Sequence, residues 1–220
     1  MSQTIGTQQS QSAQIAIVDY GLGNIRSVTR GLERGGATVE LVDTPARLDD
    51  VDGIVLPGVG AFREGVENAG PFREPLLDAA EAGKPVFGIC LGMQMLLTSS
   101  EEAAHAGEGE VTGLSLVPGR NVRFPGELNV PHMGWNQLNV ERSHPVFAGI
   151  DGGYTYFVHS YYAETDNTAA VVATSDYGVT FPAIVANEAG NVFGTQFHPE
   201  KSGEVGLRIL QNFVAFCADR

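Results

Sequence analysis

Cysteine is scarce in this chain of 220 residues, which contains only Cys90 and Cys217. Two cysteines are too few for the disulfide framework of a small secreted protein, so we expect the chain to work in a reducing cytoplasm. Long apolar runs are also missing, because no stretch approaches the roughly 20 apolar residues that span a membrane. The first residues lack the basic start and apolar stretch of a secretory signal, and we expect residues 1–13 to form a disordered tail.

Positive charge is the second scarcity. The sequence has 13 basic against 26 acidic residues, for a net charge of −13, and lysine occurs only as Lys84 and Lys201. Such a surface repels the phosphates of nucleic acids and the anionic head groups of lipids, so neither is an expected partner. An acidic surface with little lysine also suits a cytoplasm of very high salt, a hypothesis that unfolding measurements with and without salt can test.

Patterns for metals and nucleotide cofactors are missing as well. The five histidines show no i, i+4 pairing and the two cysteines lie far apart in sequence, so we expect no metal site. The chain has no Walker loop, and the segment GLGN at 21–24 is no dinucleotide fingerprint, because Arg26 stands where the third glycine belongs. We therefore expect an activity that needs no cofactor.

Short apolar runs alternate with amphipathic stretches in the first half of the chain. Strands are predicted at 14–19, 37–42, 52–58 and 85–90, and helices at 25–36, 62–82 and 91–100. The second helical stretch is interrupted near Gly70–Pro71, so it predicts one or two helices. This alternation favours the α/β class, with a mostly parallel sheet and helices on both faces.

The second half is dominated by strand patterns. Strands are predicted within 120–140, 154–163, 169–174, 181–187 and 191–197. Their short connections favour antiparallel additions to the sheet. A last amphipathic helix closes the chain, and Cys217 is interpreted as one of its packing residues. The absence of a linker or a repeat predicts one domain over residues 14–220.

Cys90 lies where an apolar strand meets a helix, in the segment GICLGMQ at 88–94. The flanking Gly88 and Gly92 permit the sharp turn of a nucleophile elbow, which pushes the side chain out above the sheet. The positive end of the following helix favours the thiolate form. The alternative is a buried packing cysteine, and the G-x-C-x-G pattern alone leaves both interpretations open.

A thiolate nucleophile needs a base, and the base needs an orienting group. The segment QFHPEKS at 196–202 places His198 at the end of a predicted strand and Glu200 two residues later, where its carboxylate can hold the imidazole. Taken alone, His-Pro-Glu is equally compatible with a polar turn. Because reactive groups gather at the carboxyl ends of parallel strands, Cys90 and His198 are expected to meet if their strands are close neighbours.

The chemistry also requires donors for an oxyanion. The segment LPGVGAF at 56–62 follows another predicted strand, and its glycines leave the backbone amides of Val59 and Gly60 accessible. Together with the amide of Leu91, just after the cysteine, they can form an oxyanion hole. The alternative is an ordinary Gly-Pro turn.

The segments PGVGAF, GICLGMQ and TQFHPEKS, in this order and spacing, resemble the class I (triad-type) glutamine amidotransferases. The resemblance extends from about residue 14 to the end of the chain. It implies that Cys90, His198 and Glu200 form the triad that hydrolyses glutamine to glutamate and ammonia. It also implies that Gly58, Gln94, Ser160 and Tyr161 bind glutamine, and it implies the flavodoxin-like α/β fold of that family. For Gln94 the alternative is a surface helix residue.

Further segments resemble the glutaminase subunits of imidazole glycerol phosphate synthases, namely DYGLGNIRSV, VPHMGWNQL and YFVHSYY. In that family the glutaminase docks on a (β/α)8-barrel cyclase subunit, which uses the ammonia to form imidazole glycerol phosphate and aminoimidazole carboxamide ribotide in histidine biosynthesis. The resemblance implies that Asn24 and Lys201 face the cyclase, and the alternatives are a tight turn for the first and a solvated charge for the second. Trp135, the sole tryptophan, is either a core residue or an interface anchor, and its place in HMGWN favours the interface. It further implies that glutaminase activity stays low until the Gly58–Gly60 strand turns an amide inward.

Two alternatives to this assignment stay open in the sequence. The chain is compatible with a class I glutaminase for another synthase, such as the pyridoxal phosphate synthase, although the HMGWN segment disfavours it. It is also compatible with a non-catalytic flavodoxin-like binding protein that carries a vestigial thiol. The complete triad disfavours the second alternative.

Overall fold

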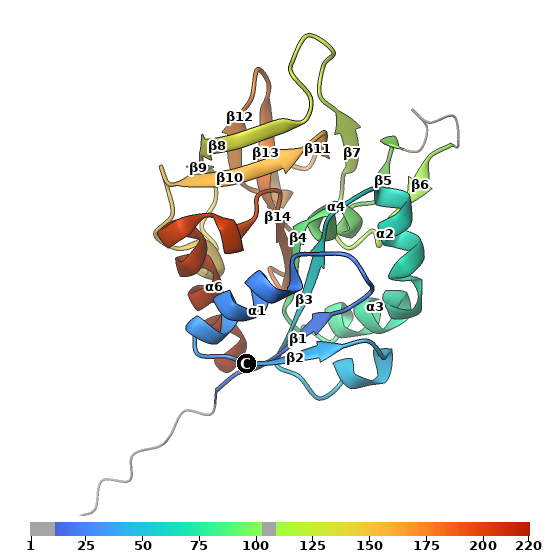
Figure 1. Cartoon of the computed structure of the whole chain (residues 1–220), viewed down its shortest axis with the longest axis vertical. Coiled ribbons are helices and arrows are strands. Elements are labelled where there is room, and N and C mark those ends of the chain that lie inside the picture. The colour runs from blue at the N-terminus through green and yellow to red at the C-terminus, as the bar shows by residue number, and fades with distance from the viewer. Residues whose placement is uncertain (1–11, 103–108) are drawn as a thin grey trace, which may run out of the picture.

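The computed structural model describes residues 12–102 and 109–220 and is built around one large sheet (Figure 1). Within these residues the central sheet has eight strands in the order β2-β1-β3-β4-β14-β13-β12-β9. The strands are β2 (Thr38–Val42), β1 (Gln14–Val18), β3 (Gly53–Gly58), β4 (Val86–Cys90), β14 (Val192–Thr195), β13 (Thr180–Ala186), β12 (Val171–Asp176) and β9 (Asn139–Val140).

The first five strands in this order run parallel to one another, and the last three are antiparallel to their neighbours. All residues of β3 and β4 are buried, as expected for parallel strands that helices cover on both faces. The expectation that the strand at 191–197 pairs antiparallel with its neighbours is wrong for one of them. β14 pairs antiparallel with β13 but parallel with β4. That second pairing joins segments far apart in sequence, so no local pattern reveals it.

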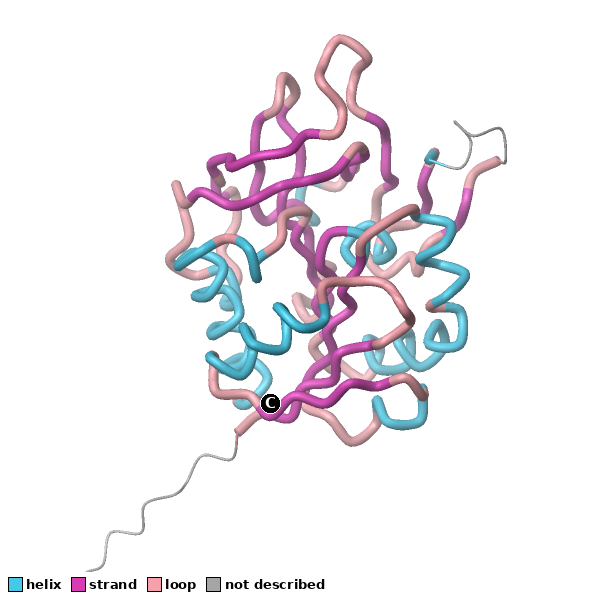
Figure 2. Tube along the Cα trace, viewed as in Figure 1, coloured by secondary structure: helices cyan, strands magenta, loops and turns pink. Residues whose placement is uncertain are grey.

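Helices cover the two faces of the sheet, as Figure 2 shows with the cyan coils on either side of the magenta strands. Alternate residues of β1 enter separate cores: Ile15 and Ile17 pack in one, and Ala16 and Val18 pack in the other. The first core is closed by α1 (Ile25–Arg34) and α6 (Gly203–Ala218), and the second by α2 (Phe62–Asn68), α3 (Arg73–Glu81) and α4 (Leu91–Leu96). No helix in the described part of the chain is both long and apolar enough to cross a membrane.

The other strands form two smaller sheets, so the expectation that they all extend the central sheet is wrong. One pairs β8 (His132–Gln137) with β10 (Tyr154–His159), and the other has the order β11-β7-β5-β6. The latter contains β11 (Tyr161–Glu164), β7 (Arg120–Arg123), β5 (Ser99–Ser100) and β6 (Val111–Thr112). The helix expected over 91–100 ends at Leu96, because residues 99–100 pair with β6 and β7 instead.

Single-turn 3-10 helices connect several of these elements. They are η1 (Pro45–Leu48), η2 (Gly70–Phe72), η3 (Pro145–Phe147), η4 (Thr168–Ala170) and η5 (Pro199–Lys201). The predicted interruption near 70–71 is confirmed, since η2 separates α2 from α3. Residues 1–11 of the expected N-terminal tail lie outside the described residues, and Ala13 is buried beside the start of β1.

Three neighbouring parallel strands bring their carboxyl ends to one edge of the central sheet. Gly58 at the end of β3 lies opposite Cys90 at the end of β4, and Thr195 of β14 lies opposite Ile89. The segments that follow these strands therefore meet at one edge, where ligands bind in open α/β sheets. The expected meeting of the cysteine strand and the histidine strand is confirmed.

Candidate active site

Cys90 lies in a strained turn between β4 and α4. Its φ of 54° places a non-glycine residue in the left-handed region, at a cost of about 1–3 kcal/mol. The neighbouring glycines allow the helix to start close to the sheet: a Cβ at Gly92 would lie 1.8 Å from the Leu56 carbonyl oxygen, and one at Gly88 would lie 2.7 Å from the Gly92 carbonyl carbon. The backbone therefore has the form of a nucleophile elbow.

His198 and Glu200 are held in a short turn after β14. The imidazole Nδ1 lies 2.9 Å from Glu200 Oε1, and the two side chains are 2% and 0% exposed. Ser202 fixes this turn, because its hydroxyl donates to the His198 carbonyl at 2.6 Å and accepts from the Tyr156 amide at 3.0 Å. A carboxylate on Nδ1 directs the other ring nitrogen, Nε2, away from the turn.

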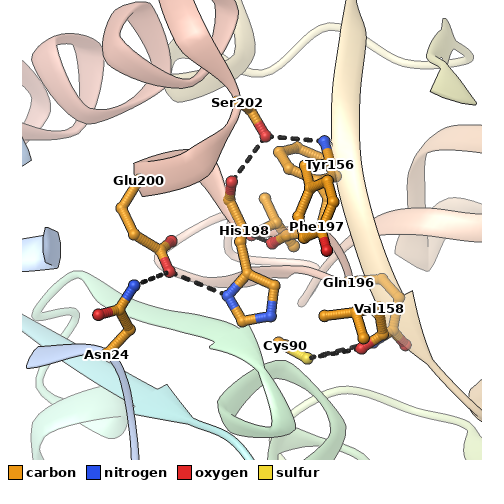
Figure 3. A network of polar contacts seen from close by, with 10 residues as sticks. Asn24, Cys90, Tyr156, Val158, Gln196, Phe197, His198, Glu200 and Ser202 are labelled. Atoms are coloured by element: carbon orange, nitrogen blue, oxygen red, sulfur yellow. Dashed lines mark hydrogen bonds and ion pairs between the residues drawn. The ribbon is translucent and has the colours of Figure 1, made fainter. Parts of the chain in front are cut away.

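The imidazole lies between Glu200 and Cys90, as Figure 3 shows. Burial lowers the pKa of His198, but its interactions with Cys90 and Glu200 outweigh burial and raise that pKa to about 10. Among the described residues, His198 Nε2 is buried and has no hydrogen-bond partner. A protonated imidazole with a free N–H beside a thiol is the arrangement that a cysteine nucleophile and its acid–base partner require.

One glutamine contacts the sulfur, and a second glutamine contacts the first. Gln196 points its Nε2 at the Cys90 sulfur at 3.8 Å and accepts a hydrogen bond from Gln94 Nε2 at 3.1 Å. Gln94 also donates to the Tyr161 carbonyl at 3.0 Å and is 7% exposed, so it is no surface residue. Sequence reasoning missed Gln196, although its position two residues before His198 places both on one side of an extended chain.

A cavity of about 270 Å³ opens beside these groups. It is lined by Val59, Gly60, Cys90, Leu91, Gln94, Glu102, Pro131, Val158, His159, Ser160, Tyr161 and His198. All predicted oxyanion-hole residues and three of the four predicted glutamine-binding residues thus line the cavity. Gly58, the fourth, is buried beside Cys90 in the adjacent strand.

Glu102 contributes a carboxylate to this cavity, and sequence reasoning did not identify it. Its Oε2 accepts a hydrogen bond of 2.7 Å from the Phe62 amide, at the start of α2. Glu102 therefore joins the cavity wall to the segment that follows Gly60. Nothing local in the acidic run at 99–110 distinguishes it, because the bond spans two segments that meet only in the fold.

The turn after β3 presents Val59 and Gly60 to the cavity. Gly60 has a φ of +100°, which favours glycine, and Val59 is 40% exposed. Behind the turn, the buried Tyr20 hydroxyl donates to the Pro57 carbonyl at 2.5 Å, and burial, with the charge of Cys90, raises the pKa of this phenol. Tyr20, another residue missed from the sequence, thus holds the strand that leads into the turn.

The three residues predicted to face a partner lie in different surroundings. Asn24 is half-buried and donates to Glu200 Oε1 at 3.3 Å, so it also supports the carboxylate. Lys201 is exposed, with Nζ 5.9 Å from the centre of the Tyr156 ring. Trp135 on β8 is 55% exposed, and Met133 and Tyr154 beside it are 67% and 57% exposed. These last three form an apolar patch on the β8–β10 sheet.

No group of three or more histidine, cysteine, aspartate or glutamate side chains is placed to hold a metal ion within residues 12–102 and 109–220. The cavity offers instead a thiol, two imidazoles, amide groups and one carboxylate. This set is suited to binding a small polar molecule and to acyl transfer through sulfur.

Sequence comparison relates this chain to proteins of known family. The family described as "Glutamine amidotransferase class-I" matches residues 16–216. A protein of Halobacterium salinarum named "Imidazole glycerol phosphate synthase subunit HisH" is 68% identical, with 99% of each chain covered. A protein of the same name from Natronomonas pharaonis is 71% identical over 96% of this chain and 98% of its own length.

Solved structures share the fold. A putative GMP synthase protein of Thermoplasma acidophilum superposes with a TM-score of 0.71 at 23% identity, covering 94% of this chain and 95% of its own. The structure of PurLQS from Thermotoga maritima gives a TM-score of 0.71 at 25% identity, covering 93% of this chain and 99% of the matched chain. The expected α/β fold of the amidotransferase kind is confirmed.

Proposed function

The chain belongs to the class I glutamine amidotransferases, and within them to the HisH subunits of imidazole glycerol phosphate synthase, and from this premise we propose how it acts on L-glutamine. Cys90, His198 and Glu200 hydrolyse the side-chain amide to glutamate and ammonia. The observation that carries this proposal is the placement of Cys90 and His198 at the wall of one small polar cavity, with the Glu200 carboxylate buried behind them on Nδ1 of the imidazole.

In the first half-reaction the Cys90 thiolate attacks the side-chain amide carbon of glutamine. The carbonyl electrons move onto oxygen, and the protonated His198 gives its Nε2 proton to the departing nitrogen, which leaves as ammonia. The product is a γ-glutamyl thioester. Glu200 keeps the imidazole oriented and stabilises its positive charge through the 2.9 Å contact with Nδ1.

In the second half-reaction His198, now neutral, takes a proton from water. The hydroxide attacks the thioester carbon, the carbon–sulfur bond breaks, and glutamate leaves while Cys90 returns to the thiolate. Backbone amides at Val59, Gly60 and Leu91 stabilise the oxyanion in both halves. Each such donor is worth about 3 kcal/mol, so the orientation of one peptide in the turn at 58–60 can change the rate a hundredfold or more.

Glutamine itself is held by groups at the cavity wall. Three of these groups belong to Gln94, Ser160 and Tyr161, which line the same cavity as Cys90. The Glu102 carboxylate, on the same cavity, can pair with the α-ammonium of the substrate, because a charged donor on a carboxylate is the stronger kind of hydrogen bond. This pairing would select an α-amino acid over a simple amide.

The partner is proposed to be the cyclase subunit of the synthase, a (β/α)8 barrel that consumes the ammonia. The apolar patch of Met133, Trp135 and Tyr154 is the proposed docking surface, and Asn24 and Lys201 are proposed to contribute to it. Exposed tryptophan and tyrosine are typical anchors of protein interfaces. Docking would also set the peptide orientation in the turn at 58–60, and through it the glutaminase rate.

Two further expectations stay proposals. Residues 14–220 are proposed to act as one glutamine amidotransferase domain, with both cores sharing the central sheet. The proposed localisation of the protein is the cytoplasm, where its two free, buried cysteines would stay reduced.

The decisive experiment reconstitutes the synthase from this chain and its cyclase, and compares two nitrogen sources. Cys90→Ala should abolish product formation from glutamine and leave product formation from added ammonium unchanged, because the cyclase is not altered. Loss of both activities would contradict the division of labour. Full glutamine-dependent activity of the variant would contradict the role of the thiol.

A further inference from the structure

A buried pair of histidines, one of which lines the cavity, takes no part in the mechanism above. His132 of β8 and His159 of β10 are directly opposite each other in the ladder, and they are 3% and 6% exposed. His132 Nδ1 lies 3.1 Å from His159 Nε2. Phe124, Phe157, Phe181 and Tyr177 surround the two rings. For two adjacent imidazoles to form a hydrogen bond, one ring must donate and the other must accept, so each ring needs a defined tautomer.

The hydrogen bonds determine the tautomer of each ring. His159 Nδ1 lies 2.8 Å from the Tyr161 carbonyl oxygen, which can only accept, so Nδ1 carries the proton. Burial lowers the pKa of His159 to about 3 and that of His132 to about 4, so both rings are neutral at neutral pH. The Nε2 of neutral His159 therefore accepts from His132 Nδ1. His132 Nε2 in turn faces the Asn136 amide nitrogen at 3.4 Å.

This hydrogen-bond chain ends at a corner of the backbone. β10 ends at His159 and pairs with β8, whereas β11 begins at Tyr161 and pairs with β7 in another sheet. Ser160 makes the turn between the two sheets, and all three corner residues line the cavity. The Tyr161 carbonyl receives two donors, His159 Nδ1 and Gln94 Nε2, so the corner is fixed from two sides.

We propose that His159 is a positioning residue for glutamine binding: its Nδ1–H fixes the Tyr161 carbonyl, and His132 fixes the tautomer that allows it. The two histidines thus shape the backbone at Ser160–Tyr161 that receives the substrate, without touching the bond that breaks. This inference rests on the proposed function, and it adds a contribution to glutamine affinity rather than to the chemical step.

Two substitutions at His159 distinguish the contribution of Nδ1 from that of Nε2. An asparagine amide can place its nitrogen near the position of Nδ1 and keep the bond to Tyr161, whereas a glutamine amide reaches the position of Nε2 and keeps only the contact to His132. In the synthase assembled with its cyclase, His159→Gln should raise the KM for glutamine about tenfold with kcat changed less than about threefold. His159→Asn should bring the KM back to within about threefold of the parent value.

A second pair of variants tests His132, which is one hydrogen bond further from the Tyr161 carbonyl than His159. His132→Asn keeps a donor toward His159 and His132→Leu removes it, so the leucine variant should show the larger KM. His144→Gln is the matched control, because this buried histidine bonds the Gly190 carbonyl and packs on Phe193 and Phe216, away from the cavity wall. Its KM should equal that of the parent.

The outcomes discriminate clearly. Equal KM values for His159→Asn and His159→Gln, or a fall confined to kcat, would overturn the positioning role. If neither His159 variant folds, as judged by thermal unfolding, the His132 pair decides in the same way. A parent complex that does not hydrolyse glutamine at all would reject the proposed function. An active parent whose variants have an unchanged KM would reject only the positioning role.

Discussion

The two cysteines of this chain occupy opposite environments. Cys217 lies within α6, is 1% exposed and packs among the apolar residues of the first core, and burial raises the pKa of its thiol to about 12. Cys90 lies in a strained turn at the edge of the sheet, where it lines a cavity and adjoins His198. The flanking glycines and the strand end, rather than burial, distinguish the proposed nucleophile from the packing cysteine, because both thiols are buried.

Of the substitutions that test this difference between the two cysteines, the one at His198 should have the largest effect on activity. His198→Asn leaves both thiols in place but removes the proton donor and acceptor, so glutaminase turnover should fall by at least about 10³-fold. Steady-state hydrolysis of glutamine in the assembled synthase measures it. A variant within tenfold of the parent would mean that the environment of Cys90 is not the one described.

Glu200→Gln should have a smaller effect. The amide keeps the size of the side chain but removes the negative charge that orients and stabilises the imidazolium, so we expect a fall in kcat of about 10²-fold. The Asn24 contact with the same oxygen would remain available to a glutamine. A loss as large as that of His198→Asn would show that the carboxylate does more than orient the ring.

The raised pKa of His198 makes a prediction about stability and pH. Its value of about 10 in the folded chain lies above the ordinary 6.5, so the charged ring stabilises the fold fully below pH 6.5, and this contribution is lost as pH rises toward 10. The difference in unfolding free energy between the parent and His198→Asn should therefore shrink from pH 6 to pH 10. Chemical denaturation at several pH values measures it, and a difference that grows with pH contradicts the assignment.

Cys217→Ala should give the smallest effect on activity. The substitution leaves a small cavity beside Gly53 and Phe213, which costs about 1 kcal/mol of stability, and glutaminase turnover should stay unchanged. Thermal unfolding and the glutaminase assay measure the two quantities separately. Loss of turnover in a folded variant would remove the functional distinction between the two cysteines.

Local patterns predict much of this structure. The apolar runs that end at Gly58 and Cys90 form buried parallel strands, and the glycines around Cys90 fit a turn that leaves no room for a Cβ at Gly92. The positions of His198 and Glu200 follow from a strand end and a proline turn. These features depend on neighbours in sequence, so periodicity and turn chemistry are sufficient to find them.

The remainder depends on pairings between distant segments. The parallel pairing of β14 with β4 and the separate β8–β10 sheet join residues that no local pattern connects. For the same reason Glu102, Gln196 and Tyr20 were missed, since each matters through one contact with a remote segment. Their residue types alone are compatible with an acidic loop, a strand and a turn.

Covalent labelling tests the central claim most directly, because it compares the two thiols in one sample. A diazo ketone analogue of glutamine should alkylate Cys90 alone when the assembled synthase is treated at neutral pH, and excess glutamine should protect it. Peptide mass spectrometry locates the adduct. One protected adduct on the peptide that contains Cys90 is the result we expect, and an adduct on Cys217, or labelling that glutamine does not slow, would contradict the account.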